Sequence, residues 1–158
     1  MKALQIVKYG ELKDGLSIKE TVKPTMNATD ILIETKEAAL NPIDSELVSG
    51  GLKDMVPLDL PTTIGFDGSG VVAEKGAEVS DFDLGNAVYA RVPQNQMGTV
   101  AEYVAVDAKV VSKKPENISF EEAAGLPLIG LTSIQALERV GLKKKRPNTY
   151  SCRVKWCW

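Results

Sequence analysis

The sequence predicts a mainly β, α+β fold, in which short strands form a partly open barrel or a sandwich and helices follow them. Three observations predict it. Short segments alternate between apolar and polar residues, as strands with one buried face do. Gly, Pro, Asn and Asp separate these segments at short intervals. From Ser119 onward, a helix start signal and helical spacing of apolar residues replace the alternation.

The predicted strands occupy the first two thirds of the chain. Alternation is clearest over residues 16–22, 31–36 and 100–106. Two shorter segments, 71–73 and 87–92, are rich in β-forming residues. With 158 residues in all, the chain is long enough for one domain with a sizeable core.

Helical signals are confined to the C-terminal part. Ser119 and Glu122 have the spacing of a capping box, in which each side chain accepts a hydrogen bond from the backbone N–H of the other residue. We expect this helix to extend to about Leu126, where Pro127 interrupts it because proline has no N–H to donate. Apolar residues then recur at helical spacing up to Gly141, a typical helix stop. They are Leu131, Ile134, Leu137 and Val140.

Composition excludes several classes of protein. Hydrophobic residues make up 44% and charged residues 25%, which is typical of a globular chain and not of a disordered one. No apolar segment approaches the ~18 residues of a membrane span, and the N-terminal residues lack the apolar core of a signal peptide. We therefore expect a cytoplasmic protein without a membrane partner. The absence of histidine excludes Ser-His-Asp and Cys-His catalysis and removes the commonest metal ligand.

The end of the chain differs in composition from the rest. From Lys143 onward there are six basic residues and no acidic one, which leaves 13 basic against 21 acidic residues in 1–142. This acidic body repels phosphates, so we expect no nucleic-acid partner. Both cysteines and both tryptophans also lie here, and two thiolates alone do not complete a zinc shell. These four residues are Cys152, Trp156, Cys157 and Trp158.

Four segments carry a family resemblance: residues 38–44, 60–72, 85–103 and 123–133. In this order and spacing they resemble the N-terminal GroES-like catalytic domain of the medium-chain dehydrogenase/reductase superfamily, and within it the zinc-free quinone oxidoreductase branch that includes zeta-crystallin. The resemblance covers about residues 1–142. It implies a GroES-like partly open β-barrel over 1–125, and a connecting helix over 126–142 that leads towards a Rossmann domain missing from this chain.

The resemblance also implies an activity: hydride transfer from NADPH to a quinone or an α,β-unsaturated carbonyl, in a full-length form that is able to form a homodimer. Zinc-dependent members carry a Cys where this chain has Asn41 to Asp44, and a His-Glu pair where it has Phe66 and Asp67. We therefore expect no metal, and the missing ligands argue against a zinc alcohol dehydrogenase. A non-catalytic GroES-like binding module is the alternative.

By resemblance, Asn41 is a catalytic and cofactor-binding residue, whose amide lies near the nicotinamide and donates to a substrate carbonyl; an Asn-Pro turn residue is the alternative. Asp44 is a second catalytic candidate that orients its neighbours, or it caps a helix. Thr132 lies where the family's helix touches the cofactor, or its hydroxyl bonds back to its own helix. Many quinone reductases have a tyrosine two residues after the Asp, and this chain has Glu46 there, so we expect no phenolic proton donor at this position.

The expected substrate pocket consists of Ile64, Phe66 and Asp67. Asp67 acts there as an acid or a base, or else as a hydrogen-bonded structural residue. Glycines at positions 65, 68 and 70 allow close approach of the backbone and permissive dihedral angles at the start of a strand. They contact a ligand directly, or else they shape a turn.

No glycine follows Gly141, so the chain lacks the glycine-rich turn that cradles the NADPH pyrophosphate. Read one base later, the codons of the last three residues spell Gly, then Ala or Val, then Gly, which resembles that turn. We interpret residues 143–158 as an out-of-frame tail that begins between about Lys143 and Tyr150; a domain followed by a foreign tail is the alternative. In either case we expect a truncated, inactive fragment whose last helix has a partly exposed apolar side.

Overall fold

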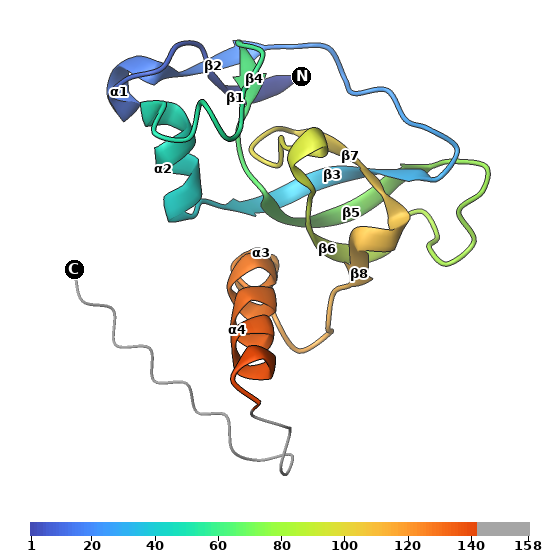
Figure 1. The fold of residues 1–158 in the computed structure, drawn as a ribbon. Coiled ribbons are helices and arrows are strands. Elements are labelled where there is room, and N and C mark those ends of the chain that lie inside the picture. Colours follow the sequence, from blue (N-terminus) through green and yellow to red (C-terminus); the bar gives the residue numbers. More distant parts are fainter. Residues whose placement is uncertain (142–158) are drawn as a thin grey trace.

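The structure, a computed structural model, describes residues 1–141. Its strands form two antiparallel sheets that do not close into a complete barrel (Figure 1). The smaller sheet has the order β2-β1-β4 and the larger one the order β7-β3-β5-β6-β8. The strands are β1 (Lys2–Ile6), β2 (Leu16–Glu20), β3 (Asp30–Ala39), β4 (Thr62–Thr63), β5 (Asp67–Lys75), β6 (Ala87–Arg91), β7 (Tyr103–Asp107) and β8 (Val111–Lys113). The predicted α+β fold with its partly open barrel is confirmed.

Helices cover one end of this framework. Below the smaller sheet lies α2, while α3 and α4 follow one another below the larger sheet (Figure 1). No helix within residues 1–141 is both long and apolar enough to cross a membrane. The helical elements are α1 (Leu12–Gly15), α2 (Pro42–Ser49), α3 (Phe120–Ala124) and α4 (Pro127–Arg139), with 3-10 turns η1 (Gln94–Gln96) and η2 (Ala108–Val110).

The predicted capping box is present at the start of α3. The Glu122 N–H donates to Ser119 Oγ at 3.2 Å, and the Ser119 N–H donates to Glu122 Oε2 at 2.9 Å. The predicted break near Pro127 is present, with one correction: Pro127 begins α4 and does not itself interrupt a helix. The break lies before it, at Gly125 and Leu126. Proline is well suited to the first helical turn, where its missing N–H would have no partner within the helix.

Two clusters of buried residues form the core. The larger cluster lies along the five-stranded sheet and includes Ile31, Val88 and Val106. The smaller cluster joins the three-stranded sheet to α2, and its members are Ile6, Leu47, Val48, Ile64 and Phe66. The backbones of β3 and β5 approach each other closely at Gly70, where a Cβ would collide with the Glu34 carbonyl oxygen.

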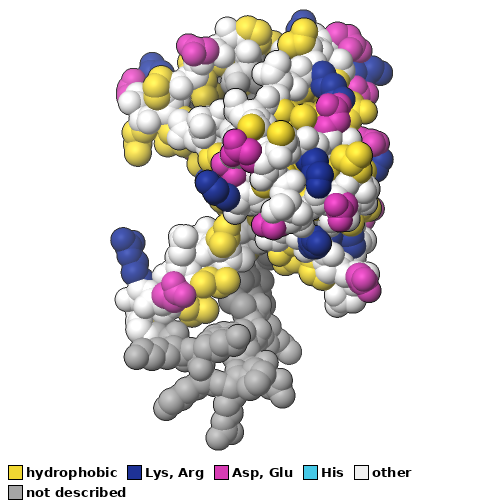
Figure 2. All heavy atoms as spheres, turned by 90° about the vertical axis from the view of Figure 1, so that its right-hand side faces the viewer, with side chains coloured by type: hydrophobic (Ala, Val, Ile, Leu, Met, Phe, Trp, Pro, Cys, Tyr) yellow, Lys and Arg dark blue, Asp and Glu magenta, His cyan; other side chains and the backbone are white. Residues whose placement is uncertain are grey.

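The helix α4 is much less covered than the barrel. The side chains of Leu131 and Ile134 are 50% and 55% exposed, whereas Leu137 is half-buried. The expected partial exposure of the apolar side of this helix is therefore found. Figure 2 shows that acidic and basic side chains are interspersed over the barrel face turned to the viewer.

Candidate functional site

Two helices begin at the same buried side chain. Asp67, the first residue of β5, is completely buried. Its Oδ2 accepts a hydrogen bond from Asn41 Nδ2 at 3.1 Å and another from the Leu128 backbone N–H at 3.2 Å. Asn41 is the N-cap of α2 and Leu128 is the second residue of α4. The N-termini of α2 and α4 therefore converge on one carboxylate, although they lie far apart in the sequence.

Asn41 is fixed at its backbone as well as at its side chain. Its backbone N–H donates to Asp44 Oδ2 at 2.7 Å, so Asp44 caps the helix that Asn41 opens. A side-chain amide has two N–H groups, of which Asn41 gives one to Asp67. Its second amide N–H makes no hydrogen bond to another group within residues 1–141. This arrangement provides a half-buried donor with a fixed orientation, suited to a carbonyl oxygen.

A helix at this place was expected only in the alternative that Asp44 caps one, while Asn41 and Pro42 were considered as turn residues. The structure places Pro42 at the first helical position, where proline is favoured, and puts Gly50 in the left-handed conformation that ends the helix. The segment is only eight residues long, so its helical periodicity is too short to distinguish from a turn. The Asn-Pro sequence followed by Asp44 was the available signal for a helix N-terminus.

Burial dominates the electrostatics of the two aspartates. It raises the pKa of Asp67, against the opposing effects of the Asn41 amide, the Leu128 N–H and the Arg91 charge. Burial also raises the pKa of Asp44; the negative charge of Asp67 adds to this, while the N–H groups of Asn41 and Gly65 oppose it. Each carboxylate keeps one buried oxygen without a hydrogen-bond partner in the described part of the chain: Oδ1 in both residues. Proton uptake by this pair is thus easier than in water.

Arg91 is a site residue that the sequence analysis did not identify. It lies opposite Asp67 in the β5–β6 register, and its guanidinium stands 5.3 Å from the centre of the Phe66 ring. Its positive charge opposes the rise in the pKa of Asp67 that burial causes. In β6, half-buried Tyr89 and Arg91 flank buried Ala90, so the alternation of the strand was a signal that both face away from the core.

The remaining predicted site residues lie in different surroundings. Ile64 and Phe66 are fully buried in the smaller core cluster. Thr132 is exposed on α4, one turn after Leu128. The structure thus brings Asn41 and Asp67 together with Asp44, while no hydrogen bond within residues 1–141 joins Thr132 to them. The roles of all these residues towards a substrate or a cofactor stay predictions.

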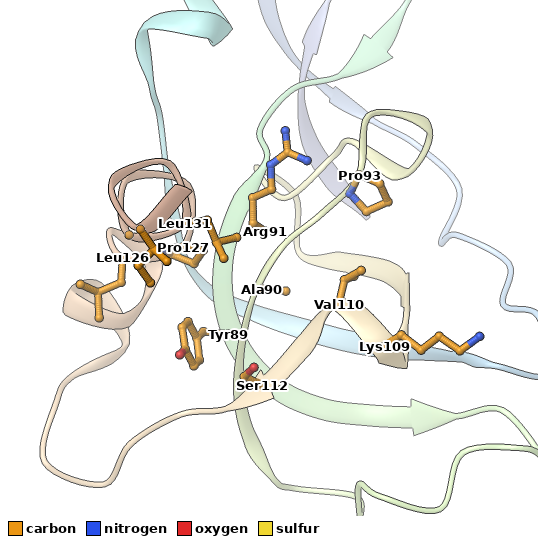
Figure 3. Close-up of a pocket in the computed structure, with 12 residues that line it drawn as sticks. Tyr89, Ala90, Arg91, Pro93, Lys109, Val110, Ser112, Leu126, Pro127 and Leu131 are labelled. Atoms are coloured by element: carbon orange, nitrogen blue, oxygen red, sulfur yellow. The ribbon is translucent and has the colours of Figure 1, made fainter. Parts of the chain in front are cut away.

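A cavity of about 550 Å³ lies beside this cluster, between α4 and the edge of the larger sheet. Figure 3 shows Leu126, Pro127 and Leu131 on one side of it and Tyr89 and Arg91 on the other. The cavity is therefore lined by apolar residues of the α4 region together with the phenol of Tyr89 and the positively charged side chain of Arg91.

Within residues 1–141, no three His, Cys, Asp or Glu side chains converge as ligands of a metal ion would. The chain has no histidine, and both cysteines lie beyond residue 141. The interpretation of residues 143–158 as an out-of-frame tail concerns a segment outside the described residues.

Comparison with known proteins identifies similar sequences. The family of alcohol dehydrogenase GroES-like domains matches residues 27–116. The chain is similar to a 2-methylene-furan-3-one reductase of Solanum lycopersicum, with 38% identity over 89% of this chain and 38% of that protein. It is also similar to a chloroplastic NADPH-dependent alkenal/one oxidoreductase of Arabidopsis thaliana, with 39% identity over 88% of this chain and 37% of that protein. The chain spans about two fifths of the length of the curated relatives it matches.

Solved structures show the same likeness. A quinone oxidoreductase from Coxiella burnetii superimposes with a TM-score of 0.84 and 33% sequence identity. The match covers 90% of this chain and 46% of that one. The similarity therefore extends over nearly all of this chain, and over less than half of the solved structure.

Proposed function

The chain belongs to the alcohol dehydrogenase GroES-like family within the medium-chain dehydrogenase/reductase superfamily, and from this premise we propose that it supplies the catalytic-domain part of an NADPH-dependent reductase. Its relatives are quinone and alkenal oxidoreductases. The substrates we propose are quinones or α,β-unsaturated carbonyls. The activity belongs to a longer chain, because this one spans about two fifths of its relatives.

The observation that carries the proposal is the fixed amide of Asn41. Hydride addition to an enone or a quinone places negative charge on the carbonyl oxygen. A donor held in place before the reaction stabilises this charge without reorganising. Asn41 meets that requirement, because Asp67 orients its side chain, Asp44 holds its backbone N–H, and one amide N–H stays available.

The described residues fit only one end of NADPH. Bound NADPH supplies the hydride. We assign Asn41 and the exposed Thr132 to its nicotinamide end. Residues 1–125 then form the catalytic domain, and 126–142 form the connection to a cofactor domain. Since the pyrophosphate requires a glycine-rich turn at a helix N-terminus, we propose that these 158 residues alone bind NADPH weakly and do not reduce quinones.

The side chains available as metal ligands argue against zinc-dependent alcohol oxidation. A catalytic zinc ion needs three protein ligands, usually from His, Cys and carboxylates. The chain has no histidine, and its cluster offers the two carboxylates of Asp44 and Asp67 with an amide between them. A zinc-dependent alcohol oxidation is therefore not proposed.

The test is a chimera in which residues 1–141 precede the C-terminal three fifths of the Solanum lycopersicum relative. NADPH consumption is followed with a panel of enones and quinones, next to the 158-residue chain alone. We expect turnover from the chimera and none from the chain. Asn41→Ala in the chimera should lower kcat about 100-fold, the scale for losing one donor to a developing oxyanion.

The matched control is Asn95→Ala, which removes an exposed asparagine of η1 and should leave kcat unchanged. Calorimetric titration with NADPH completes the comparison. Tight NADPH binding or turnover by the 158 residues alone would contradict the assignment of the cofactor to a second domain. Unchanged kcat in Asn41→Ala would remove Asn41 from the reaction.

A further inference from the structure

We propose that Asp67 is a positioning residue, which fixes the Asn41 amide and the start of α4 relative to one another through a single buried carboxylate. The inference rests on the proposed function, since it concerns how Asn41 and the helix that carries Thr132 are held together. Asp67 itself is completely buried, so we assign it no contact with a substrate.

The first part of the argument is the start of α4. The first four N–H groups of any helix have no acceptor within that helix. In α4 the N-cap residue is Leu126, whose side chain makes no capping hydrogen bond. The Leu128 N–H is donated instead to Asp67, which lies 61 positions earlier in the sequence. A negative charge at this place also interacts favourably with the dipole of the helix. Asp67 therefore supplies the capping hydrogen bond that the side chain of Leu126 does not make.

The second part is that the same oxygen serves α2. Asp67 Oδ2 also accepts the Nδ2–H of Asn41, the residue that opens α2. Any shift of this oxygen moves a hydrogen-bond partner of both helices together. Thr132 lies one turn beyond Leu128, so the position of its backbone follows the start of α4.

The third part is the position of Asp67 in the larger sheet. It begins β5, a central strand of the larger sheet, with β3 on one side and β6 on the other. Ser69, the next residue on the same side of this strand, donates to the Phe120 carbonyl oxygen at 2.6 Å at the start of α3. Two alternate residues of β5 thus hold the two successive helices. Asp44 from α2 and Arg91 from β6 are the charged groups that act on the Asp67 carboxylate.

The experiment follows two reporters by NMR in the 158-residue chain without any cofactor: hydrogen exchange of the Leu128 amide and the chemical shifts of the Asn41 side-chain amide. In Asp67→Ala we expect Leu128 exchange to rise about tenfold, and the Asn41 resonances to move towards those of exposed Asn95. Asp67→Asn keeps one side-chain oxygen acceptor and should rescue both reporters in part. Asp44→Ala is the matched control, because it removes a buried acceptor of the Asn41 backbone N–H but no partner of Leu128, and it should leave Leu128 unchanged.

Unchanged Leu128 exchange in Asp67→Ala overturns the proposal, and so does an equal change in Asp44→Ala. A change at Leu128 alone reduces Asp67 to a cap of α4 and also overturns it. If Asp67→Ala does not fold, Asp67→Asn decides: we expect exchange about threefold faster at Leu128 with shifted Asn41 resonances, and wild-type values at both reporters contradict the proposal.

These reporters need no cofactor, so they distinguish this inference from the proposed function. In the chimera, Asp67→Ala should lower kcat about tenfold while Asn41 remains in the sequence. If both NMR reporters change and kcat does not, the positioning by Asp67 stands and the catalytic role of Asn41 fails.

Discussion

The barrel and α4 both contain large apolar side chains, but those of the barrel are buried and those of α4 are half exposed. In the barrel, Phe66 is 2% exposed and Val88 is fully buried between strands. In α4, Leu131 and Ile134 leave half of their side chains exposed. Burial of a large apolar side chain contributes about 1.5–3 kcal/mol, so most of the stabilising area lies in the barrel. The sequence of α4 makes one of its sides apolar. Burial of that side requires another surface that packs against it.

The two regions differ in how much of their apolar surface the described part of the chain buries. The barrel supplies its own core through long-range strand pairing. At its N-terminal end, α4 is tied to the barrel by the hydrogen bond from Leu128 to Asp67. Matched substitutions in the two regions should therefore have unequal, and in one case opposite, effects on the free energy of unfolding.

The largest difference is expected between two truncations of apolar side chains. Phe66→Ala leaves a cavity in the smaller core cluster and should lower the free energy of unfolding by about 3–5 kcal/mol. Leu131→Ala removes a half-exposed side chain and should change it by less than about 0.5 kcal/mol. Urea unfolding of both variants measures the difference. Similar losses in the two variants would show that α4 is packed as firmly as the barrel.

A smaller difference, with opposite signs, is expected for glycine-to-alanine changes. Gly70→Ala forces a methyl group against the Glu34 carbonyl oxygen and should cost about 1–3 kcal/mol. Gly130→Ala adds a methyl group inside α4, where nothing lies within 4 Å, and should stabilise the helix by about 0.5–1 kcal/mol. Thermal unfolding compares the two. Destabilisation by Gly130→Ala would mean that another group occupies the space beside α4.

The smallest expected effect is a dependence of the free energy of unfolding on pH, and it arises from Asp67 in the barrel. Burial raises the pKa of Asp67, so the folded state holds its proton more tightly than the unfolded chain does. The resulting stabilisation is complete below the ordinary pKa of an aspartate. It is lost as the pH rises through the raised pKa, by about 1.4 kcal/mol for each unit of the shift.

Asp67→Asn carries no titrating proton, so it should lose less stability than the wild type over that pH range. Urea unfolding at a series of pH values measures the difference between the two proteins. Glu138→Gln, which removes a carboxylate from exposed α4, controls for the loss of a negative charge elsewhere. Parallel pH profiles for the wild type and Asp67→Asn would show that Asp67 titrates alike in the folded and the unfolded state.

Local signals predicted much of the fold. Alternation placed three predicted segments on observed strands, because one-sided burial imposes a period of two residues, and β-forming residues placed two more. The capping box at Ser119 was correct because its two hydrogen bonds join residues three positions apart. The break predicted near Pro127 is present, but Pro127 begins the second helix and does not end the first, and the sequence pattern alone did not distinguish these two roles of proline.

The candidate site was only partly predictable. Asn41, Asp44 and Asp67 were named from the sequence by resemblance, and the Asp44 cap lies within one turn of helix. The link from Asn41 to Asp67 spans 26 positions, and the link from Asp67 to Leu128 spans 61. Arg91 enters the site only through the register of β6 against β5.

The sequence by itself determined five of the strand segments, where α3 begins, and that α4 has one apolar side. These properties depend on residues a few positions apart, whose spacing is visible in the chain. Only the tertiary structure decided that the N-termini of α2 and α4 meet at Asp67, and that the charge of Arg91 acts on the same carboxylate. The physical reason is that hydrogen bonds and charges act across space, and strand pairing sets which distant residues become neighbours.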